Sequence, residues 1–131
     1  MGTRSLTFIY EDNLPVVNMY RQFDGYPSGH GADLAKFLAS APVVDGLGSD
    51  QQAAFNGMAC LAAQMVGHFK AGKPGGIYLF HPDTRDCWQE YEYHVSYLAD
   101  SGFFIRVACE GNGDILFEGD LKQFTAWCEE N

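Results

Sequence analysis

The chain has 131 residues, of which 47% are hydrophobic and 15% aromatic, and a chain of this size buries about two-thirds of the surface that its unfolded form exposes. Seventeen acidic against eight basic residues give a formal net charge of -9, which repels nucleic acid phosphates and argues against broad DNA or RNA binding. No apolar run reaches the roughly 18 residues of a membrane span, and the first residues lack the apolar stretch of a signal peptide. We therefore expect a single domain over residues 1–131, located in the cytoplasm and not in a membrane.

The first third of the chain predicts a β-hairpin, a loop and a short helix. Residues 4–22 hold two β-prone runs on either side of turn-forming residues, and Pro15 suits the first residue of the second strand. The glycine-rich residues 24–31 form a tight connection, after which residues 32–40 repeat apolar side chains at helical spacing. Residues 41–52 show no period and are expected to form a surface loop.

Residues 53–70 carry the strongest helical pattern, because their apolar side chains recur with the helical period throughout. The other side of this helix carries small residues such as Gly57, Ala63 and Gly67. We therefore expect a central helix that is buried on more than one face. Glycine and proline in residues 71–76 end it.

The rest of the chain predicts four strands and a final helix. The expected strands cover residues 76–81, 90–99, 103–110 and 115–118, and the helix covers residues 120–130 with Asp120 as its N-cap. Two tight turns join the last three strands into an antiparallel meander. The predicted fold class is α+β: an antiparallel sheet of five or six strands, formed by the N-terminal hairpin and the C-terminal meander, packed against a long central helix and two shorter helices.

The segment from Tyr20 to Gly31, YRQFDGYPSGHG, is a turn, a binding site, or both. As a turn, Asp24 and Ser28 cap the backbone while Tyr26 packs on the sheet. As a site, the glycines and the start of the next helix offer backbone N–H groups to an anion such as phosphate. The segment is neither a Walker A loop nor a dinucleotide fingerprint, because no Lys-Ser or Lys-Thr follows the glycines and no βαβ unit surrounds them.

Two side chains in loops have both a chemical and a structural interpretation. His30 would act as a general base with Asp24 orienting it, or serve as a capping or solvent-facing histidine. Arg85, which follows Thr84 in the run HPDTRD, would bind a phosphate or carboxylate with two guanidinium nitrogens. Its alternative role is an ion pair with a neighbouring aspartate that fixes the loop.

Other clusters predict neither a metal nor a cofactor. His81 and His94 do not have a specific metal-ligand spacing, and the four cysteines include no C-x-x-C pair. Tyr91, Tyr93 and Tyr97 alternate along one predicted strand. They would either stack a nucleobase or pack one face of the sheet against helices.

A resemblance to a known family is carried by the runs MGTRSLT, YRQFDGYPSGHG, NGMACLAAQMVGHFK, GGIYLF and TRDCWQEYEYHV. They are similar to a family of small uncharacterised proteins of bacteriophages and bacterial genomes, with the pattern MGTRS, YRQ-[FY]-DGYP-[ST]-GHG, NGM-x-CLAAQ and TRD. The resemblance covers most of the chain and implies no catalytic mechanism. It implies an accessory protein of phage or prophage genomes, where such proteins often counter host defence, some by sequestering nucleotide signals.

The positions of the basic residues lead to our first hypothesis for the function. Five of them lie in or beside the glycine-rich or strand-end segments: Arg4, Arg21, Lys70, Lys73 and Arg85. Our first hypothesis is therefore a non-enzymatic binder of a small anionic, nucleotide-like ligand, whose contacts converge at one end of the sheet. The residues predicted to bind the ligand are Arg4, Arg21, Asp24, Tyr26, Ser28, Gly29, His30, Lys73, Thr84 and Arg85.

Two further hypotheses belong to other classes. One is an enzyme that acts on such a ligand, with His30 as acid or base and Asp24 orienting it. The other is an inhibitor that uses its acidic surface to cover a basic face of a host protein. A homodimer formed through an edge strand or an exposed aromatic face is compatible with all three hypotheses.

Overall fold

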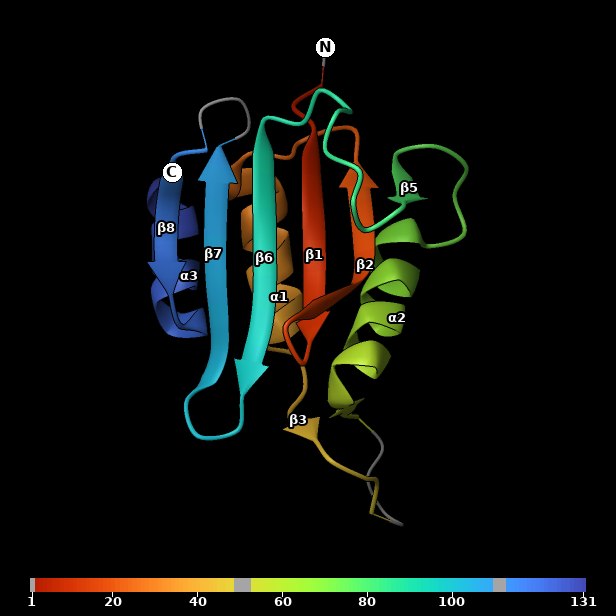
Figure 1. Ribbon diagram of the computed structural model, residues 1–131, viewed down its shortest axis with the longest axis vertical. Coiled ribbons are helices and arrows are strands. Elements are labelled where there is room, and N and C mark those ends of the chain that lie inside the picture. Colours follow the sequence, from red (N-terminus) through yellow and green to blue (C-terminus); the bar gives the residue numbers. More distant parts are fainter. Residues whose placement is uncertain (1, 49–52, 110–112) are drawn as a thin grey trace.

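The computed structural model describes residues 2–48, 53–109 and 113–131. In this part of the chain, one six-stranded sheet carries helices on one face, which makes the fold α+β as predicted (Figure 1). The strands of the sheet are β1 (Ser5–Glu11), β2 (Leu14–Arg21), β5 (Ile77–Phe80), β6 (Tyr91–Leu98), β7 (Gly102–Cys109) and β8 (Ile115–Gly119).

The strands lie in the order β5-β2-β1-β6-β7-β8. The hairpin β1–β2, the pair β2–β5 and the meander β6–β7–β8 are antiparallel, which confirms the predicted hairpin and meander. The strands β1 and β6, however, pair in parallel, with Ser5 beside Tyr91 and Ile9 beside Val95. The sheet is therefore mixed rather than wholly antiparallel, because the hairpin and the meander join through two strands that run in the same direction.

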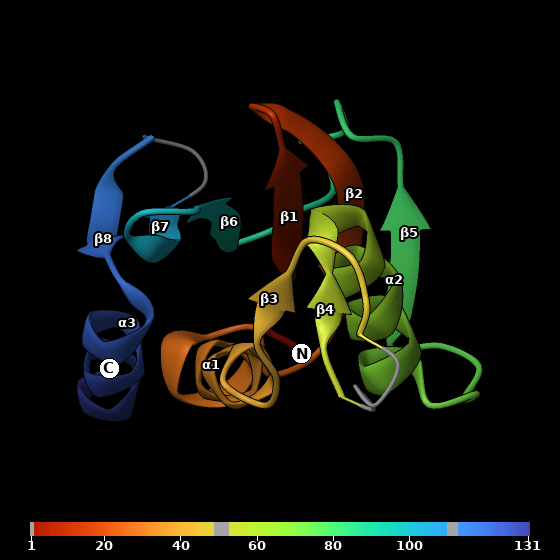
Figure 2. The same ribbon diagram turned by 90° about the horizontal axis from the view of Figure 1, so that it is seen from below.

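The helical elements of the described residues are a π-helical turn (Pro27–Gly31), α1 (Ala32–Leu38), α2 (Gly57–Lys70) and α3 (Leu121–Glu130). Figure 2 shows α1, α2 and α3 on the same side of the sheet. The N-cap of α3 is confirmed: the Asp120 carboxylate accepts from the Gln123 N–H at 2.8 Å, and the Gln123 side chain accepts from the Asp120 N–H at 2.9 Å. Within the described ranges, no helix combines the length and the apolar character that crossing a membrane requires.

Side-chain alternation along the strands produces two apolar clusters. On the helix-covered face, Ile9, Tyr93 and Val107 are fully buried against the helices. The packing expected for the tyrosine row is thereby confirmed for Tyr93. On the other face, called the open face below, Leu6 and Phe8 are the centre of a smaller cluster.

The start of α2 differs from the prediction. Phe55 and Asn56 form the short strand β4 (Phe55–Asn56), which pairs in parallel with β3 (Val43–Val44). The helix therefore begins at Gly57 rather than at residue 53. Residues 49–52 of the predicted loop, and residues 110–112 of the predicted strand end and turn before β8, lie outside the described residues.

The surroundings of α2 also differ from the prediction. Its buried residues Met58, Leu61 and Met65 lie on one side, whereas Ala63 and Gly67 are exposed. The helix lies beside β2 and β5 at one edge of the sheet (Figure 1). The expectation of a central helix buried on more than one face is therefore wrong, because no second layer packs on its small residues within the described structure.

Residues 22–26 pass the start of β1 at very short range. The Gly25 N–H donates to the Thr3 carbonyl at 2.8 Å, and the Tyr93 hydroxyl donates to the Gly25 carbonyl at 2.7 Å. A Cβ atom at residue 25 would lie 2.8 Å from the Thr3 oxygen and 2.9 Å from the Arg4 carbonyl carbon. Only a residue without a side chain permits this approach.

We therefore expect Gly25→Ala to lower the free energy of unfolding by roughly 2 kcal/mol, because the backbone of β1 has to move away. The control is Gly67→Ala, since a Cβ atom there meets nothing within 4 Å. Alanine on this exposed helical position should raise the free energy of unfolding by up to about 1 kcal/mol. Urea denaturation of both variants checks the pair, and equal effects of the two substitutions would contradict the packing described.

Candidate functional site

A cleft of about 820 Å³ lies between α1 and α2, at the end of the sheet where β2 ends and β5 begins. It is lined by the basic residues Arg21, Lys36, Lys70 and Lys73, by the rings of Phe23, Phe37, His68 and Phe69, and by Gly75 and Gly76, among others. Four of the eight basic residues of the chain thus line one cleft. Asp33 is the one acidic residue among the described residues that line it. We call this the cationic cleft.

Arg21 joins three segments at the floor of the cationic cleft. Its Nε donates to the Phe23 carbonyl at 2.8 Å, and its Nη1 lies 3.1 Å from an Asp33 carboxylate oxygen on α1. The same Nη1 donates to His30 Nδ1 at 3.2 Å, and the guanidinium lies 5.9 Å from the centre of the Phe69 ring. Arg21 therefore holds the end of β2, the glycine-rich segment and α1 in one arrangement.

His30 is fully buried beneath Arg21. Because arginine only donates hydrogen bonds, His30 Nδ1 must be the acceptor. Its Nε2–H then donates to Thr7 Oγ1 at 2.7 Å. Burial and the neighbouring Arg21 charge lower the pKa of His30 to about 3, so the ring is uncharged near neutral pH. Both ring nitrogens are engaged and solvent does not reach them, which argues against a ligand contact and an acid–base role for His30. The solvent-facing alternative is wrong, because the residue is fully buried.

The glycine-rich segment uses its own backbone N–H groups. The Gly29 N–H donates to the Tyr26 carbonyl at 3.0 Å and the His30 N–H donates to the Asp24 carbonyl at 2.7 Å. The side chains of Asp24 and Ser28 are exposed and are not among the residues that line the cationic cleft. The backbone of the segment forms a turn, but the predicted details are wrong: within the described residues neither Asp24 nor Ser28 caps the backbone with its side chain, and Tyr26 is 38% exposed rather than packed on the sheet. The Gly29 and His30 amides already have acceptors, which argues against their use as a phosphate cradle.

Lys70 closes the turn that follows α2. Its Nζ donates to the Ile77 carbonyl at 2.7 Å and to the Gly75 carbonyl at 3.3 Å, and lies 5.2 Å from the centre of the Tyr78 ring. Gly75 and Gly76 have φ angles of 74° and 77°, which glycine adopts without strain. Lys70 and Arg21 thus both serve structure and leave positive charge at the floor of the cleft.

Lys36 and Lys73 differ from these two residues. Both side chains are exposed, on α1 and on the turn after α2. Within the part of the chain that the structure describes, neither ammonium group has a hydrogen bond or an ion pair to protein. They are therefore the two cations of the cleft that remain available to an anion.

The other predicted site residues lie elsewhere. Arg4 and Tyr26 line a separate hollow of about 640 Å³ at the start of β1 and β6. Thr84 and Arg85 belong to the connection between β5 and β6, on the open face. Only Arg21 and Lys73 of the predicted residues meet in the cationic cleft, because the sheet separates this cleft from Arg85.

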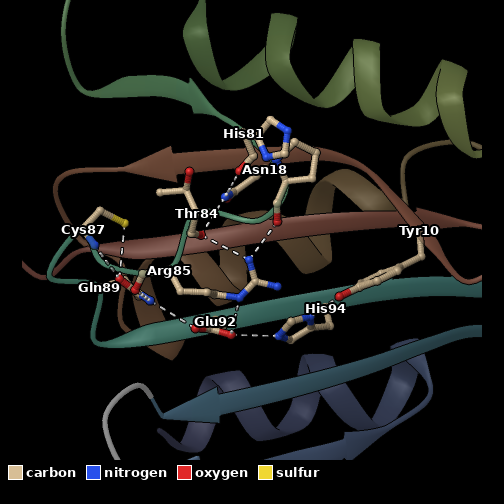
Figure 3. A network of polar contacts seen from close by, with 10 residues as sticks. Tyr10, Asn18, His81, Thr84, Arg85, Cys87, Gln89, Glu92 and His94 are labelled. Atoms are coloured by element: carbon tan, nitrogen blue, oxygen red, sulfur yellow. Dashed lines mark hydrogen bonds and ion pairs between the residues drawn. The ribbon is translucent and has the colours of Figure 1, made fainter.

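The connection from β5 to β6 is pinned to the open face by a polar network (Figure 3). The Asn18 side chain donates to the His81 carbonyl at 3.0 Å and to the Thr84 carbonyl at 3.1 Å. The Arg85 guanidinium lies 4.1 Å from the centre of the Phe8 ring and donates to the Pro82 carbonyl at 2.8 Å. These contacts give Arg85 a structural role within its own connection.

Glu92 is the acceptor at the centre of this network. It accepts from His94 Nε2 at 3.2 Å and from Gln89 Nε2 at 3.1 Å, and lies 3.8 Å from Arg85 Nε. The hydrogen bond from His94, with help from Gln89 and Arg85, holds the pKa of Glu92 below its ordinary value. The other ring nitrogen of His94, Nδ1, lies 2.7 Å from the Tyr10 hydroxyl, which extends the network to β1. The ion pair of Arg85 is thus with Glu92 rather than with the neighbouring aspartates considered from the sequence.

Sequence reasoning missed Lys36 and His68 as residues of the cleft. Lys36 lies three positions after Asp33, so both project from the same side of α1. This spacing predicts that Lys36 lines the cleft only if one knows that Arg21, the ion-pair partner of Asp33, faces the same helix. Arg21 lies on a strand fifteen residues before Lys36, so the sequence does not show this. No sequence pattern marks His68 as a cleft residue. Only the folded structure shows that His68 lies on the exposed side of α2.

No protein-family model matches this chain, and no curated protein or solved structure matches it significantly.

Because the folded protein keeps His30 uncharged down to a pH of about 3, its stability should fall on acidification. The unfolded chain binds a proton at His30 below the ordinary histidine pKa of 6.5, so stability rises with pH between about 3 and 6.5 and is fully present above this window. We expect a loss of roughly 2 kcal/mol in the free energy of unfolding between pH 6.5 and pH 5.

Urea denaturation across this pH range measures the effect. His30→Gln serves as the comparison, because it keeps the other three histidines and removes the group that titrates in the unfolded chain. Its stability should depend less steeply on pH over the same range. Equal slopes for the two proteins would contradict the buried, uncharged histidine.

Proposed function

We propose that the protein binds a small anionic, nucleotide-like ligand in the cationic cleft without changing it chemically. The observation that carries the proposal is the concentration of charge: a chain with a net charge of -9 places half of its basic residues around one cleft. This cluster is positive although the molecule as a whole is negative. Its four cations repel one another within the cleft. An anion that occupies the cleft relieves this repulsion.

The shape and the walls of the cleft favour a ligand that has an aromatic part as well as a charge. Its volume of about 820 Å³ lies in the range of small-molecule sites, roughly 300–1,000 Å³. His68 and Phe69 present rings at the cleft, and the His68 ring lies 5.3 Å from that of the buried Phe37. Aromatic rings stack on nucleobases, whereas the lysines bind phosphate. Lys36 and Lys73 would bind the phosphate groups.

Binding without chemistry is the simpler role, because the histidine that the sequence suggested as a catalyst is sealed below Arg21. A protein of this kind lowers the free concentration of its ligand. Sequestration of a nucleotide signal would be a counter-defence function, which the resemblance to phage proteins suggests. Recovery of the ligand unchanged after prolonged incubation separates a binder from an enzyme.

The variant Lys36→Ala/Lys73→Ala tests the proposal, because the ammonium groups of these two lysines make no hydrogen bond or ion pair within the described structure. Isothermal titration with inorganic pyrophosphate, adenosine, adenosine triphosphate and a panel of cyclic nucleotides should detect binding of phosphorylated compounds only. The double variant should bind the best of them about tenfold more weakly or worse, because two charge-assisted contacts are lost. Binding should also weaken as salt is added.

Lys122→Ala is the matched control, since Lys122 is an exposed lysine of α3 outside the cleft. Its affinity should equal that of the wild-type protein. The proposal would be overturned if no compound of the panel bound detectably, or if the double variant bound the best compound as tightly as the wild-type protein does.

A further inference from the structure

Trp88 is presented to solvent in an unusual way. Its side chain is 81% exposed, the largest value among the exposed large hydrophobic residues of the described chain. Its backbone has a φ of 65°, a left-handed conformation that is rare for a bulky residue and costs free energy. Because the Trp88 ring is exposed, packing in the core does not explain why the backbone adopts this strained conformation.

Gln89 holds this presentation in place. Its side chain is almost fully buried, with 2% exposed. Its Oε1 accepts from the Cys87 N–H and from the Cys87 thiol at 3.2 Å each, which closes a tight loop around Trp88. Its Nε2 donates to the Arg85 carbonyl and to Glu92. Figure 3 shows Cys87, Gln89 and Glu92 joined in this way. Gln89 therefore connects the residue before Trp88 to Glu92 on β6.

A hollow lies directly beside the exposed ring. The hollow of about 640 Å³ at the start of β1 and β6 is lined by Trp88 itself, by Tyr26 and Tyr91, and by Arg4. Tyr26 is 38% exposed. Within the described structure, the Arg4 guanidinium has no hydrogen bond or ion pair to protein. The protruding Trp88 ring, called the knob below, therefore lies beside a hollow that is also lined by aromatic rings, called the hole.

This surface is complementary to itself. In a twofold dimer each copy offers the same patch, so a knob beside a hole can enter the hole of the other copy while receiving its knob. Arg4 and Glu90 line the same hollow, where the Glu90 N–H donates to the Arg4 carbonyl at 2.8 Å. The hollow therefore carries one charge of each sign, and a second copy that is turned by a twofold axis can oppose each charge with its opposite. Tryptophan, tyrosine and arginine are the residues that most often dominate the binding energy of protein interfaces.

We propose that the protein forms a twofold homodimer in which Trp88 of each copy inserts into the hollow lined by Arg4, Tyr26 and Tyr91 of the other. In this arrangement Glu90 of one copy approaches Arg4 of the other. These contacts offset the repulsion between two chains of net charge -9 at the place where they meet. The interface is separate from the cationic cleft, so the dimer does not depend on the proposed ligand.

Sedimentation velocity from micromolar to millimolar concentration tests the dimer. The wild-type protein should show a monomer–dimer equilibrium. Trp88→Ala should raise the dissociation constant at least about 30-fold, the effect of removing a hot-spot side chain. Leu14→Ala is the matched control: Leu14 is 68% exposed at the far end of β2, and its loss should leave the constant unchanged.

A charge exchange identifies the partner as a second copy. Arg4→Glu and Glu90→Arg should each raise the dissociation constant by about tenfold, and the double variant should return it to within about threefold of the wild-type value. The urea midpoint of each variant shows whether a local change of stability explains the result. A monomer at all concentrations, or a dimer that Trp88→Ala does not weaken, overturns the proposal and assigns the exposed ring to a different partner.

Discussion

The contact between the Arg21 guanidinium and the buried, uncharged ring of His30 organises the end of the sheet that carries the cationic cleft. A charged imidazole could not accept from Arg21, and the two cations would repel each other in a site without solvent. Burial keeps His30 neutral, and Thr7 on β1 accepts the hydrogen bond that the His30 Nε2–H donates. The position of α1 follows from this contact, because Asp33 pairs with the same guanidinium.

The basic residues of the cleft have different functions because they have different partners. Arg21 and Lys70 donate to protein carbonyls and fix the backbone on both sides of the cleft. The ammonium groups of Lys36 and Lys73 form no hydrogen bond or ion pair in the described structure, so they contribute only positive charge to the cleft. A site built in this way attracts anions over short distances only. Screening limits charge effects to about 10 Å at 0.1 M salt, so the acidic remainder of the surface does not cancel the cleft.

Much of the fold could be predicted from local pattern, whereas long-range placement could not. The hairpin over residues 4–22 and the cap at Asp120 depend on neighbouring residues, and both are confirmed. The parallel pairing of β1 and β6 joins residues more than eighty positions apart, and no local signal encodes it. The solvent-facing side of α2 was missed for the same reason, since small residues allow close packing but do not require it.

The site shows the same limit. Arg21 and Arg85 both flank strand ends, and sequence spacing alone does not say on which face of the sheet each one lies. The structure puts Arg21 under the helices and Arg85 over Phe8 on the open face. The glycines of the segment 24–31 permit close approach, but not to a ligand: Gly25 lies against the backbone of Thr3 and Arg4, Gly29 against the Asp24 carbonyl and Gly31 against the Cys128 sulfur.

We propose above all that the cationic cleft, and not the glycine-rich segment, receives the anion. Amide chemical shifts in ¹H–¹⁵N spectra, followed during titration with adenosine triphosphate, test this most directly. Binding in the cleft predicts shifts concentrated at residues 33–37 and 67–77 that saturate with added ligand. Shifts centred on residues 24–30 or 84–91, or unchanged spectra with every phosphorylated compound tried, would contradict it.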